Sequence, residues 1–203
     1  MFITLEGPEG SGKTTAVEAA VKALEEKGYQ IVRTREPGGT PIAEQIRNVI
    51  LDKDNTNMDP RTEALLYAAS RRQHLVEKVW PAIKEGKIVI CDRYLDSSLA
   101  YQGYARGLGI NAVLDINKFA AKYMPNRTYF IDIKPEVGLA RIQGRSKIDR
   151  LDLEDISFHH RVYEGYLACA KLFPERILTV NGDDTIENIV KVISSDLLKV
   201  IHE

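Results

Sequence analysis

The chain has 203 residues, 44% of them hydrophobic and 28% charged, a composition typical of a globular protein of one domain. Its net charge of −1 excludes a general attraction to nucleic acid or to an anionic membrane surface. No apolar run is long enough to span a membrane, and the two cysteines, Cys91 and Cys169, lie far apart without metal-ligand spacing. We therefore expect buried thiols in a cytoplasmic protein whose partners include neither nucleic acid nor membrane.

Short apolar runs alternate with longer helical patterns along the chain. The predicted strands are residues 2–5, 30–34, 87–91, 127–133 and 176–180. The predicted helices are residues 14–27, 41–51, 61–84, 95–104, 112–123, 136–141, 154–172 and 185–200. Such alternation predicts βαβ units, and therefore a three-layer α/β fold in which helices cover both faces of a parallel five-stranded sheet. Because the chain contains no repeat or linker, one domain over residues 1–203 is expected.

Single residues mark several helix ends. Asp59 is expected to cap the helix that Pro60 begins, because its carboxylate accepts hydrogen bonds from free N–H groups and proline suits the first turn. Gly28 and Gly86 stand at the ends of two helices, where the backbone often takes a positive φ angle. These signals support the alternation of helices and strands.

The first predicted strand runs directly into a loop with the pattern G-x-x-x-x-G-K-[ST], the phosphate-binding loop of P-loop NTPases. Glycine lets successive backbone N–H groups turn toward one anion, Lys13 adds a positive charge, and the Thr14 hydroxyl is a suitable ligand for Mg²⁺. The residues expected to bind the nucleoside triphosphate are Gly7, Pro8, Glu9, Gly10, Ser11, Gly12, Lys13, Thr14 and Thr15. The sequence therefore predicts a nucleotide-binding protein with the P-loop NTPase fold.

Charged residues follow the second predicted strand. Ligands of open α/β sheets bind beyond the carboxyl ends of the strands, and Arg35 and Glu36 lie there, beside a Pro-Gly-Gly turn at residues 37–39. The turn alone is compatible with a purely structural role, whereas the flanking charges favour a loop that faces a ligand. Arg47 follows on the next helix, where an exposed arginine is the ordinary case.

The third predicted strand leads into Asp92 and Arg93. P-loop enzymes hold Mg²⁺ with a carboxylate at this position, directly or through water, and Arg93 would face a phosphate group. A buried Asp–Arg pair with a structural role is the alternative. The next helix carries an unusually polar set, and the amide of Gln102 is able to pair with the edge of a base. The set is Ser97, Ser98, Tyr101 and Gln102.

The long third helix places an aromatic ring and an arginine on one face. Tyr67, Ser70 and Arg71 recur at the spacing i, i+3, i+4. The ring could stack on a base while the arginine holds a phosphate. On spacing alone, Tyr67 fits an ordinary core position equally well.

Residues 143–152 are the least regular part of the chain. They carry three basic and two acidic residues and little apolar content. Composition alone favours a solvated loop, but basic residues on a mobile loop are also what a phosphate-handling lid requires.

Three blocks, together with the phosphate loop, resemble the thymidylate kinase family over almost the whole chain. They are residues 90–102, residues 34–40 with Glu44 and Arg47, and residues 63–71. The resemblance implies phosphoryl transfer from ATP to dTMP, giving dTDP and ADP for dTTP synthesis. It also implies Mg²⁺ as a cofactor, with Thr14 and Asp92 at the metal, and a homodimer formed through helices.

The resemblance also implies roles for single residues. Glu9 would accept a hydrogen bond from the 3′-hydroxyl of dTMP, Tyr67 would stack on the thymine, and Gln102 with Ser98 would read its edge. The residues expected to bind dTMP are Glu9, Arg35, Glu36, Arg47, Tyr67, Arg71, Arg93, Ser97, Ser98, Tyr101 and Gln102. Bacterial relatives often have Phe where this chain has Tyr67, so the added hydroxyl needs a water or a polar neighbour.

The phosphate loop contains no arginine, so the chain resembles the class, common among bacteria, that places arginines in a lid. The lid would be residues 143–152. The residues expected to act in catalysis are Lys13, Arg93, Arg150 and Arg145. The sequence does not rank Arg141, Arg145 and Arg150 against one another; Arg150, which Leu151 and Asp152 follow, is taken as the first choice.

Two other functions fit the phosphate loop alone. Another nucleoside monophosphate kinase would keep both nucleotide sites and differ in its acceptor. A P-loop regulatory ATPase would need no acceptor pocket, and the set around Tyr67, Arg71 and Gln102 argues against it.

Overall fold

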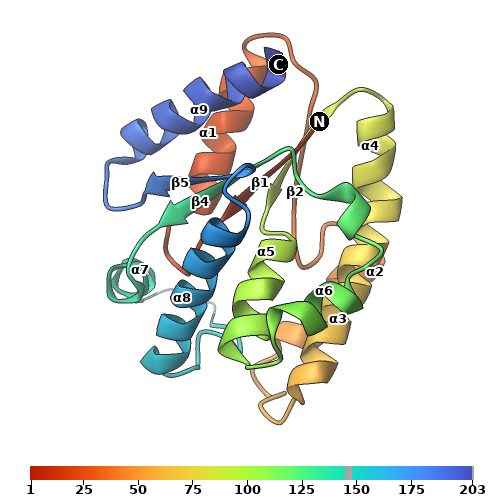
Figure 1. Cartoon of the computed structure of the whole chain (residues 1–203), viewed down its shortest axis with the longest axis vertical. Coiled ribbons are helices and arrows are strands. Elements are labelled where there is room, and N and C mark those ends of the chain that lie inside the picture. Colours follow the sequence, from red (N-terminus) through yellow and green to blue (C-terminus); the bar gives the residue numbers. More distant parts are fainter. Residues whose placement is uncertain (145–147, 203) are drawn as a thin grey trace.

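The predicted α/β fold is confirmed by the computed structural model, which describes residues 1–144 and 148–202 (Figure 1). One sheet of five parallel strands has the order β2-β3-β1-β4-β5. The strands are β1 (Phe2–Glu6), β2 (Ile31–Arg35), β3 (Ile88–Asp92), β4 (Arg127–Asp132) and β5 (Ile177–Asn181). Each bound lies within one residue of its prediction.

Helices cover both faces of this sheet. α1 (Lys13–Glu25) and α9 (Ile186–His202) lie side by side on one face (Figure 1). The opposite face is covered by α4 (Trp80–Lys84), α5 (Leu95–Ser98) and α8 (Ile156–Leu172). Three further helices pack outside this group: α2 (Pro41–Leu51), α3 (Pro60–His74) and α6 (Ile110–Ile116). α7 (Pro135–Ile142) follows β4.

The central strand β1 divides the core into two halves. Ile3 and Leu5 pack toward α1 and α9, whereas Phe2 packs into the cluster on the other face. Because side chains alternate along a strand, Glu6 lies on the same face as Phe2, although it carries a carboxylate. All five strands are parallel, so the segments that follow them gather at one edge of the sheet.

The helix predicted over residues 61–84 is interrupted. α3 passes into a π-helical segment, η1 (Leu75–Val79), before α4 continues. The ring of Pro81 explains this change, because proline has no N–H to donate to the preceding turn. The helix predicted over 95–104 is likewise α5 followed by a π-helical segment, η2 (Leu99–Ala105).

The helix predicted over residues 112–123 ends early. α6 stops at Ile116, and only a short 3₁₀ turn, η3 (Ala121–Tyr123), lies beyond it. Asn117 ends the helix with its side chain: Nδ2 donates to the Val113 carbonyl oxygen (2.9 Å), and Oδ1 accepts from Arg71 (2.7 Å). A tertiary contact therefore overrides the helical pattern.

The predicted caps and thiols are confirmed. Asp59 Oδ1 accepts from the backbone N–H groups of Arg61 and Thr62, each at 3.0 Å, and Gly28 has a φ of 86°. Cys91 and Cys169 are free and buried. Within residues 1–144 and 148–202, every helix is too short or too polar to cross a bilayer.

The phosphate loop rests directly on α7. Gly10 has a φ of 70°, and a Cβ atom at this position would collide with the Gly138 backbone. A Cβ atom at Gly138 would in turn collide with the Glu9 carbonyl oxygen. Two glycines therefore allow backbone to meet backbone between the loop and the first turn of α7.

Candidate active site

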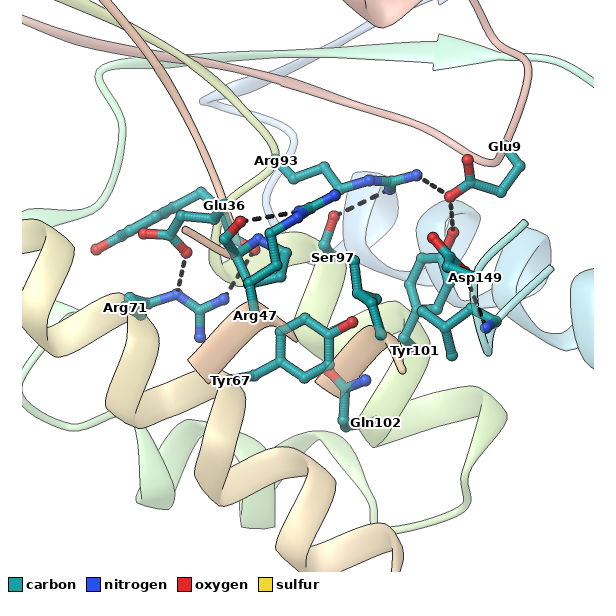
Figure 2. Close-up of a pocket in the computed structure, with 14 residues that line it drawn as sticks. Glu9, Glu36, Arg47, Tyr67, Arg71, Arg93, Ser97, Tyr101, Gln102 and Asp149 are labelled. Atoms are coloured by element: carbon teal, nitrogen blue, oxygen red, sulfur yellow. Dashed lines mark hydrogen bonds and ion pairs between the residues drawn. The ribbon is translucent and has the colours of Figure 1, made fainter. Parts of the chain in front are cut away.

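Two pockets meet at the carboxyl edge of the sheet. We name them the Lys13 pocket and the Tyr67 pocket. The Lys13 pocket is lined by Glu9, Gly10, Ser11, Gly12, Lys13, Thr14, Thr15, Asp92, Arg93, Arg141 and Ile142. The Tyr67 pocket is lined by Glu9, Glu36, Pro37, Arg47, Leu51, Tyr67, Arg71, Arg93, Tyr94, Ser97, Tyr101, Gln102, Asp149 and Leu151 (Figure 2). Glu9 and Arg93 belong to both, so a group held between them can reach either pocket.

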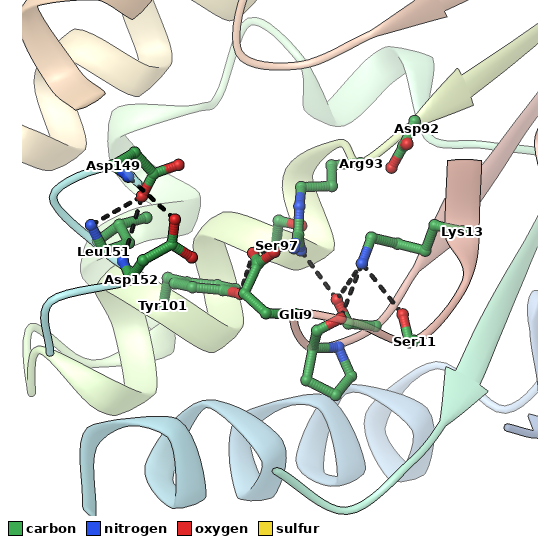
Figure 3. Close-up of polar contacts among 12 residues, drawn as sticks. Glu9, Ser11, Lys13, Asp92, Arg93, Ser97, Tyr101, Asp149, Leu151 and Asp152 are labelled. Carbon is green, nitrogen blue, oxygen red and sulfur yellow. Dashed lines mark hydrogen bonds and ion pairs between the residues drawn. The ribbon is translucent and has the colours of Figure 1, made fainter. Parts of the chain in front are cut away.

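Lys13 lies at the start of α1 and its ammonium group turns back onto the phosphate loop (Figure 3). Nζ donates to the carbonyl oxygens of Gly7 (3.0 Å) and Pro8 (2.8 Å) and to Ser11 Oγ (3.1 Å). The pKa of Lys13 is lowered to about 8, first by burial and then by the charge of Arg93. An anionic ligand in this pocket would favour the charged form of the ammonium.

Thr14 and Asp92 lie side by side where α1 begins and β3 ends. Thr14 Oγ1 donates to Asp92 Oδ2 at 3.0 Å. Within residues 1–144 and 148–202, no cluster of three His, Cys, Asp or Glu side chains forms an all-protein metal site. One carboxylate and one hydroxyl fit Mg²⁺, which keeps several waters and takes further ligands from bound phosphates.

Arg93 follows β3 in a left-handed conformation, with a φ of 69°. Its Nη1 donates to the Gly7 carbonyl oxygen (2.9 Å), Tyr166 Oη (2.8 Å) and Ser97 Oγ (3.3 Å). Its Nη2 donates to Glu9 Oε1 at 2.5 Å (Figure 3). Left-handed backbone costs a non-glycine residue about 1 kcal/mol or more, and these contacts hold it in place. The guanidinium is thus positioned between the two pockets.

A buried carboxyl group, that of Glu6, holds two of the hydrogen-bond partners of Arg93 in place. Glu6 accepts hydrogen bonds from Tyr94 N (2.7 Å), Ser97 Oγ (2.6 Å) and Tyr166 Oη (3.3 Å). The last two hydroxyls also contact Arg93, so Glu6 orients the partners of the guanidinium. Burial raises the pKa of Glu6 to about 7, and the neighbouring Asp96 carboxylate adds to the effect. The sequence pattern alone gave no sign of this role.

Arg71 is held in the wall of the Tyr67 pocket by four hydrogen bonds. Nε donates to Glu36 Oε2 (2.8 Å) and Nη1 to Asn117 Oδ1 (2.7 Å). Nη2 donates to the Tyr94 carbonyl oxygen (3.2 Å) and to Ser98 Oγ (3.0 Å). The side chain is 1% exposed, so its orientation is fixed before any ligand binds.

Most residues predicted to bind the acceptor line the Tyr67 pocket, but Arg35 and Ser98 do not. Ser98 lies behind Arg71 and accepts its hydrogen bond. Arg35 is 49% exposed, pairs with Glu44 (2.9 Å) and lines a separate pocket with Thr14 and Asp92. Arg47 does reach the pocket, and its Nη1 donates to the Pro37 carbonyl oxygen at 2.9 Å.

The three arginines discussed for the lid have different positions. Arg145 lies outside the described residues. Arg150 lines neither pocket, because Glu63 (2.6 Å) and the Ile50 carbonyl oxygen (2.9 Å) hold its guanidinium. The structure therefore does not bring the first choice, Arg150, to the phosphate loop. Arg141 lines the Lys13 pocket and donates to the Gly182 carbonyl oxygen (3.1 Å).

Sequence reasoning missed several lining residues. In the Tyr67 pocket they include Leu51, Asp149 and Leu151, and in the Lys13 pocket Ile142. Asp149 Oδ1 accepts from the backbone N–H of Leu151 (2.9 Å), which shapes the turn (Figure 3). Burial raises the pKa of Asp149. The polar composition of residues 143–152 was the available signal, but it does not show which side chains face inward.

The amino-acid sequence matches a known family. A family model described as Thymidylate kinase matches residues 5–193. The chain belongs to the thymidylate kinase family. It is accordingly a nucleoside monophosphate kinase, as predicted, and no comparison favours a regulatory ATPase.

Individual thymidylate kinases resemble the chain over nearly its full length. The enzyme of Clostridium novyi (strain NT) is 57% identical over 199 residues, which are 97% of this chain and 97% of that protein. The enzyme of Bacillus cereus (strain B4264) is 54% identical over 206 residues, covering 98% and 99%. The crystal structure of thymidylate kinase from Ehrlichia chaffeensis has a TM-score of 0.81 and 32% identity, covering 97% of this chain and 98% of that one.

The buried Glu6 predicts a pH-dependent stability. Its folded pKa of about 7 lies above the ordinary value of 4.5, so its contribution to stability is complete below about pH 4.5 and is lost as the pH rises through 7. Glu6→Gln should remove this dependence, which amounts to at most about 1.4 kcal/mol per pH unit. Urea denaturation of both proteins between pH 4.5 and 8 measures it. The exposed control Glu25→Gln should keep the wild-type slope, and an unchanged slope in E6Q would contradict the assignment.

Proposed function

We infer that the chain transfers the γ-phosphoryl group of ATP to dTMP, giving dTDP and ADP, and that the two pockets divide these substrates. ATP phosphates bind in the Lys13 pocket and dTMP binds in the Tyr67 pocket. The observation that carries this assignment is that Glu9 and Arg93 line both pockets, which brings the donor and acceptor phosphates to one point. Phosphoryl transfer depends chiefly on such positioning and on charge stabilisation.

The donor is held by the phosphate loop. On binding, the Lys13 ammonium exchanges its backbone acceptors for phosphate oxygens, since both are reached from the same loop. Thr14 and Asp92 would hold Mg²⁺, which would neutralise charge on the donor phosphates. The loop amides and the N-terminus of α1 add positive potential at the same place.

The acceptor is held by the walls of the Tyr67 pocket. The Tyr67 ring stacks on the base, and Gln102 with Arg71 reads its polar edge. Glu9 accepts a hydrogen bond from the deoxyribose, and Tyr101, whose hydroxyl lies 3.3 Å from Glu9 Oε1, packs beside the sugar. The remaining proposed contacts are Glu36, Arg47 and Ser97. Contacts from Arg35, which lines a different pocket, and from Ser98, which accepts from Arg71, stay predictions from the sequence.

Arg93 stabilises charge where the two phosphates meet. Its contacts with Gly7, Ser97 and Tyr166 fix the guanidinium, so little reorganisation is needed during transfer. The phosphate oxygen of dTMP is already a nucleophile at neutral pH, so no catalytic base is required.

A lid over residues 143–152 completes the donor site in this proposal. It closes over the phosphates and excludes water. We assign the first arginine contact to Arg141, because this side chain lines the Lys13 pocket. Catalytic roles for Arg145 and Arg150 stay predictions from the sequence.

We also propose one domain, a homodimer and a cytoplasmic location. Ile42 and Val49 on α2 and Leu65 on α3 are between 48% and 56% exposed, and α2 packs against α3. Apolar side chains exposed on two adjacent helices support association of two copies.

The two free buried thiols support the proposed cytoplasmic location, because thiols stay reduced in that compartment.

The function is tested by ADP release with a panel of acceptors. We expect the highest kcat/KM with dTMP, compared with dUMP, dCMP and the ribonucleotide of thymine. Lys13→Ala should abolish turnover while circular dichroism shows an intact fold, because the ammonium charge on the donor phosphates is lost. ATP hydrolysis that is independent of dTMP, or full activity of folded K13A, would contradict the proposal.

The lid arginines are separated by steady-state kinetics. Arg141→Ala should lower kcat at least about tenfold with little change in the KM for dTMP, because it removes charge from the donor side. Arg150→Ala should instead raise the KM for dTMP and lower the melting temperature, since it removes one of the two arginines that pair with the buried Glu63. A loss confined to kcat in R150A would favour the original prediction for Arg150.

The homodimer is tested by light scattering after gel filtration. Leu65→Glu should convert a dimer into a species of the chain mass, 22.8 kDa, because it places a charge among apolar interface side chains. Leu172→Glu, at an exposed leucine on α8, is the matched control and should leave the dimer intact. A wild-type mass equal to one chain would rule out the dimer.

A further inference from the structure

A buried carboxylate on α3 contacts Gln102, which lines the Tyr67 pocket, and so joins α3 to η2 and to the turn that contains Arg150. Glu63, in the first turn of α3, is completely buried. Its Oε1 accepts from Gln102 Nε2 (2.8 Å) and Arg106 Nε (3.4 Å). Its Oε2 accepts from Arg106 Nη2 (3.2 Å) and Arg150 Nη2 (2.6 Å). None of the roles assigned above uses this group.

The charges around Glu63 are balanced locally. Arg106 also pairs with Glu154 (2.5 Å) and lies over the Phe158 ring, 4.4 Å from its centroid. Two arginines thus face two carboxylates in a site that is largely withdrawn from water. A buried charge with this many partners strongly favours one orientation of each partner.

One of these partners is a neutral amide. A carboxylate only accepts hydrogen bonds, so the NH₂ group of Gln102, not its oxygen, must face Glu63. The Gln102 side chain is 1% exposed, and among the described residues no group donates to its Oε1. This leaves a buried acceptor in a residue that lines the Tyr67 pocket (Figure 2). A buried acceptor without a donor is unfavourable, and a ligand N–H would supply the missing hydrogen bond.

We propose that Glu63 is a positioning residue that fixes the Gln102 amide with Oε1 as its free acceptor, and so selects a pyrimidine protonated at N3. This inference rests on the proposed binding of dTMP in the Tyr67 pocket. Thymine and uracil carry an N3–H donor, whereas N3 of cytosine is an acceptor and would oppose Oε1. Without Glu63, the amide is free to rotate and present its NH₂ group to cytosine.

Glu63 also connects base selection to residues 149–151. It holds Arg150, whose two chain neighbours, Asp149 and Leu151, line the Tyr67 pocket. The Arg150 backbone N–H donates to the Leu51 carbonyl oxygen at 3.1 Å, next to another lining residue. Loss of Glu63 should therefore loosen this wall and raise the KM for dTMP.

The test compares three acceptors in wild type and Glu63→Gln. We expect the ratio of kcat/KM for dTMP to that for dCMP to fall at least about tenfold in E63Q. The ratio for dTMP to dUMP should stay unchanged, because both bases carry N3–H, and the KM for ATP should change little. Equal losses for dTMP and dCMP would overturn the inference and leave Glu63 a purely structural role.

Three further variants keep the test decisive. The exchange Glu63→Gln with Gln102→Glu keeps the net charge and again places acceptor oxygens at position 102, so it should recover selectivity against dCMP. Glu154→Gln breaks the outer pair with Arg106 without touching Gln102, and its selectivity should equal that of wild type. If E63Q does not fold, Glu63→Asp withdraws the carboxylate by one methylene and should show a smaller loss in the same ratio; no loss in E63D would overturn the inference.

A separate result would show that the proposed function fails. If wild type does not phosphorylate dTMP, the acceptor assignment is wrong whatever E63Q does. If wild type phosphorylates dTMP and prefers it to dCMP, an unchanged preference in E63Q refutes the role of Glu63 alone.

Discussion

The anchoring of Arg93 is the constraint on which the active site depends. The residue leaves β3 with a left-handed backbone, and four acceptors from the phosphate loop, α5 and α8 hold its guanidinium. Two of those acceptors are themselves oriented by Glu6 at the end of β1. The central strand, the phosphate loop and the helix after β3 are thereby fixed relative to one another. The family's chemistry needs this rigidity, because two polyanions must meet at one point.

Buried charged groups orient several side chains in and around the Tyr67 pocket. Arg71 is fixed by Glu36, and Gln102 by Glu63. His74, also fully buried, lies between Thr34 (2.7 Å) and Glu36 (2.9 Å) and so belongs to the same network. A buried ion pair adds little net stability compared with apolar packing, but it defines side-chain geometry sharply. The Tyr67 pocket therefore has its hydrogen-bonding pattern set before a ligand enters.

Contiguous patterns made much of this site predictable from the sequence. The phosphate loop, the charged turn after β2 and the Asp92-Arg93 pair each lie in one short segment, and parallel strands bring such segments to one edge. Alternating apolar runs likewise defined all five strands. The helix over residues 112–123 was predicted too long, because the contact between Asn117 and Arg71 joins residues 46 positions apart.

The supporting residues were invisible for a similar reason. Glu6 and Glu63 sit in ordinary strand and helix patterns, and their roles come from partners as distant as 160 and 87 positions along the chain. Arg150 was favoured for catalysis because of its neighbours in sequence, whereas the acceptor that holds it is Glu63 on α3. The residue type shows which side chains are chemically able to bind a phosphate or a base, but only the fold decides which of them face a pocket.

The contact between Gly10 and Gly138 has a mechanical consequence. With no side chain between them, the phosphate loop and the first turn of α7 are in direct backbone contact, so a shift of one displaces the other. The proposed lid should therefore hinge after Ile142, where α7 ends, and not at the start of α7. Gly144 has a φ of 88°, and among the described residues outside its chain neighbours no heavy atom lies within 4 Å of a Cβ placed there. With the pivot at this point, the phosphate loop would keep its shape while the proposed lid opens.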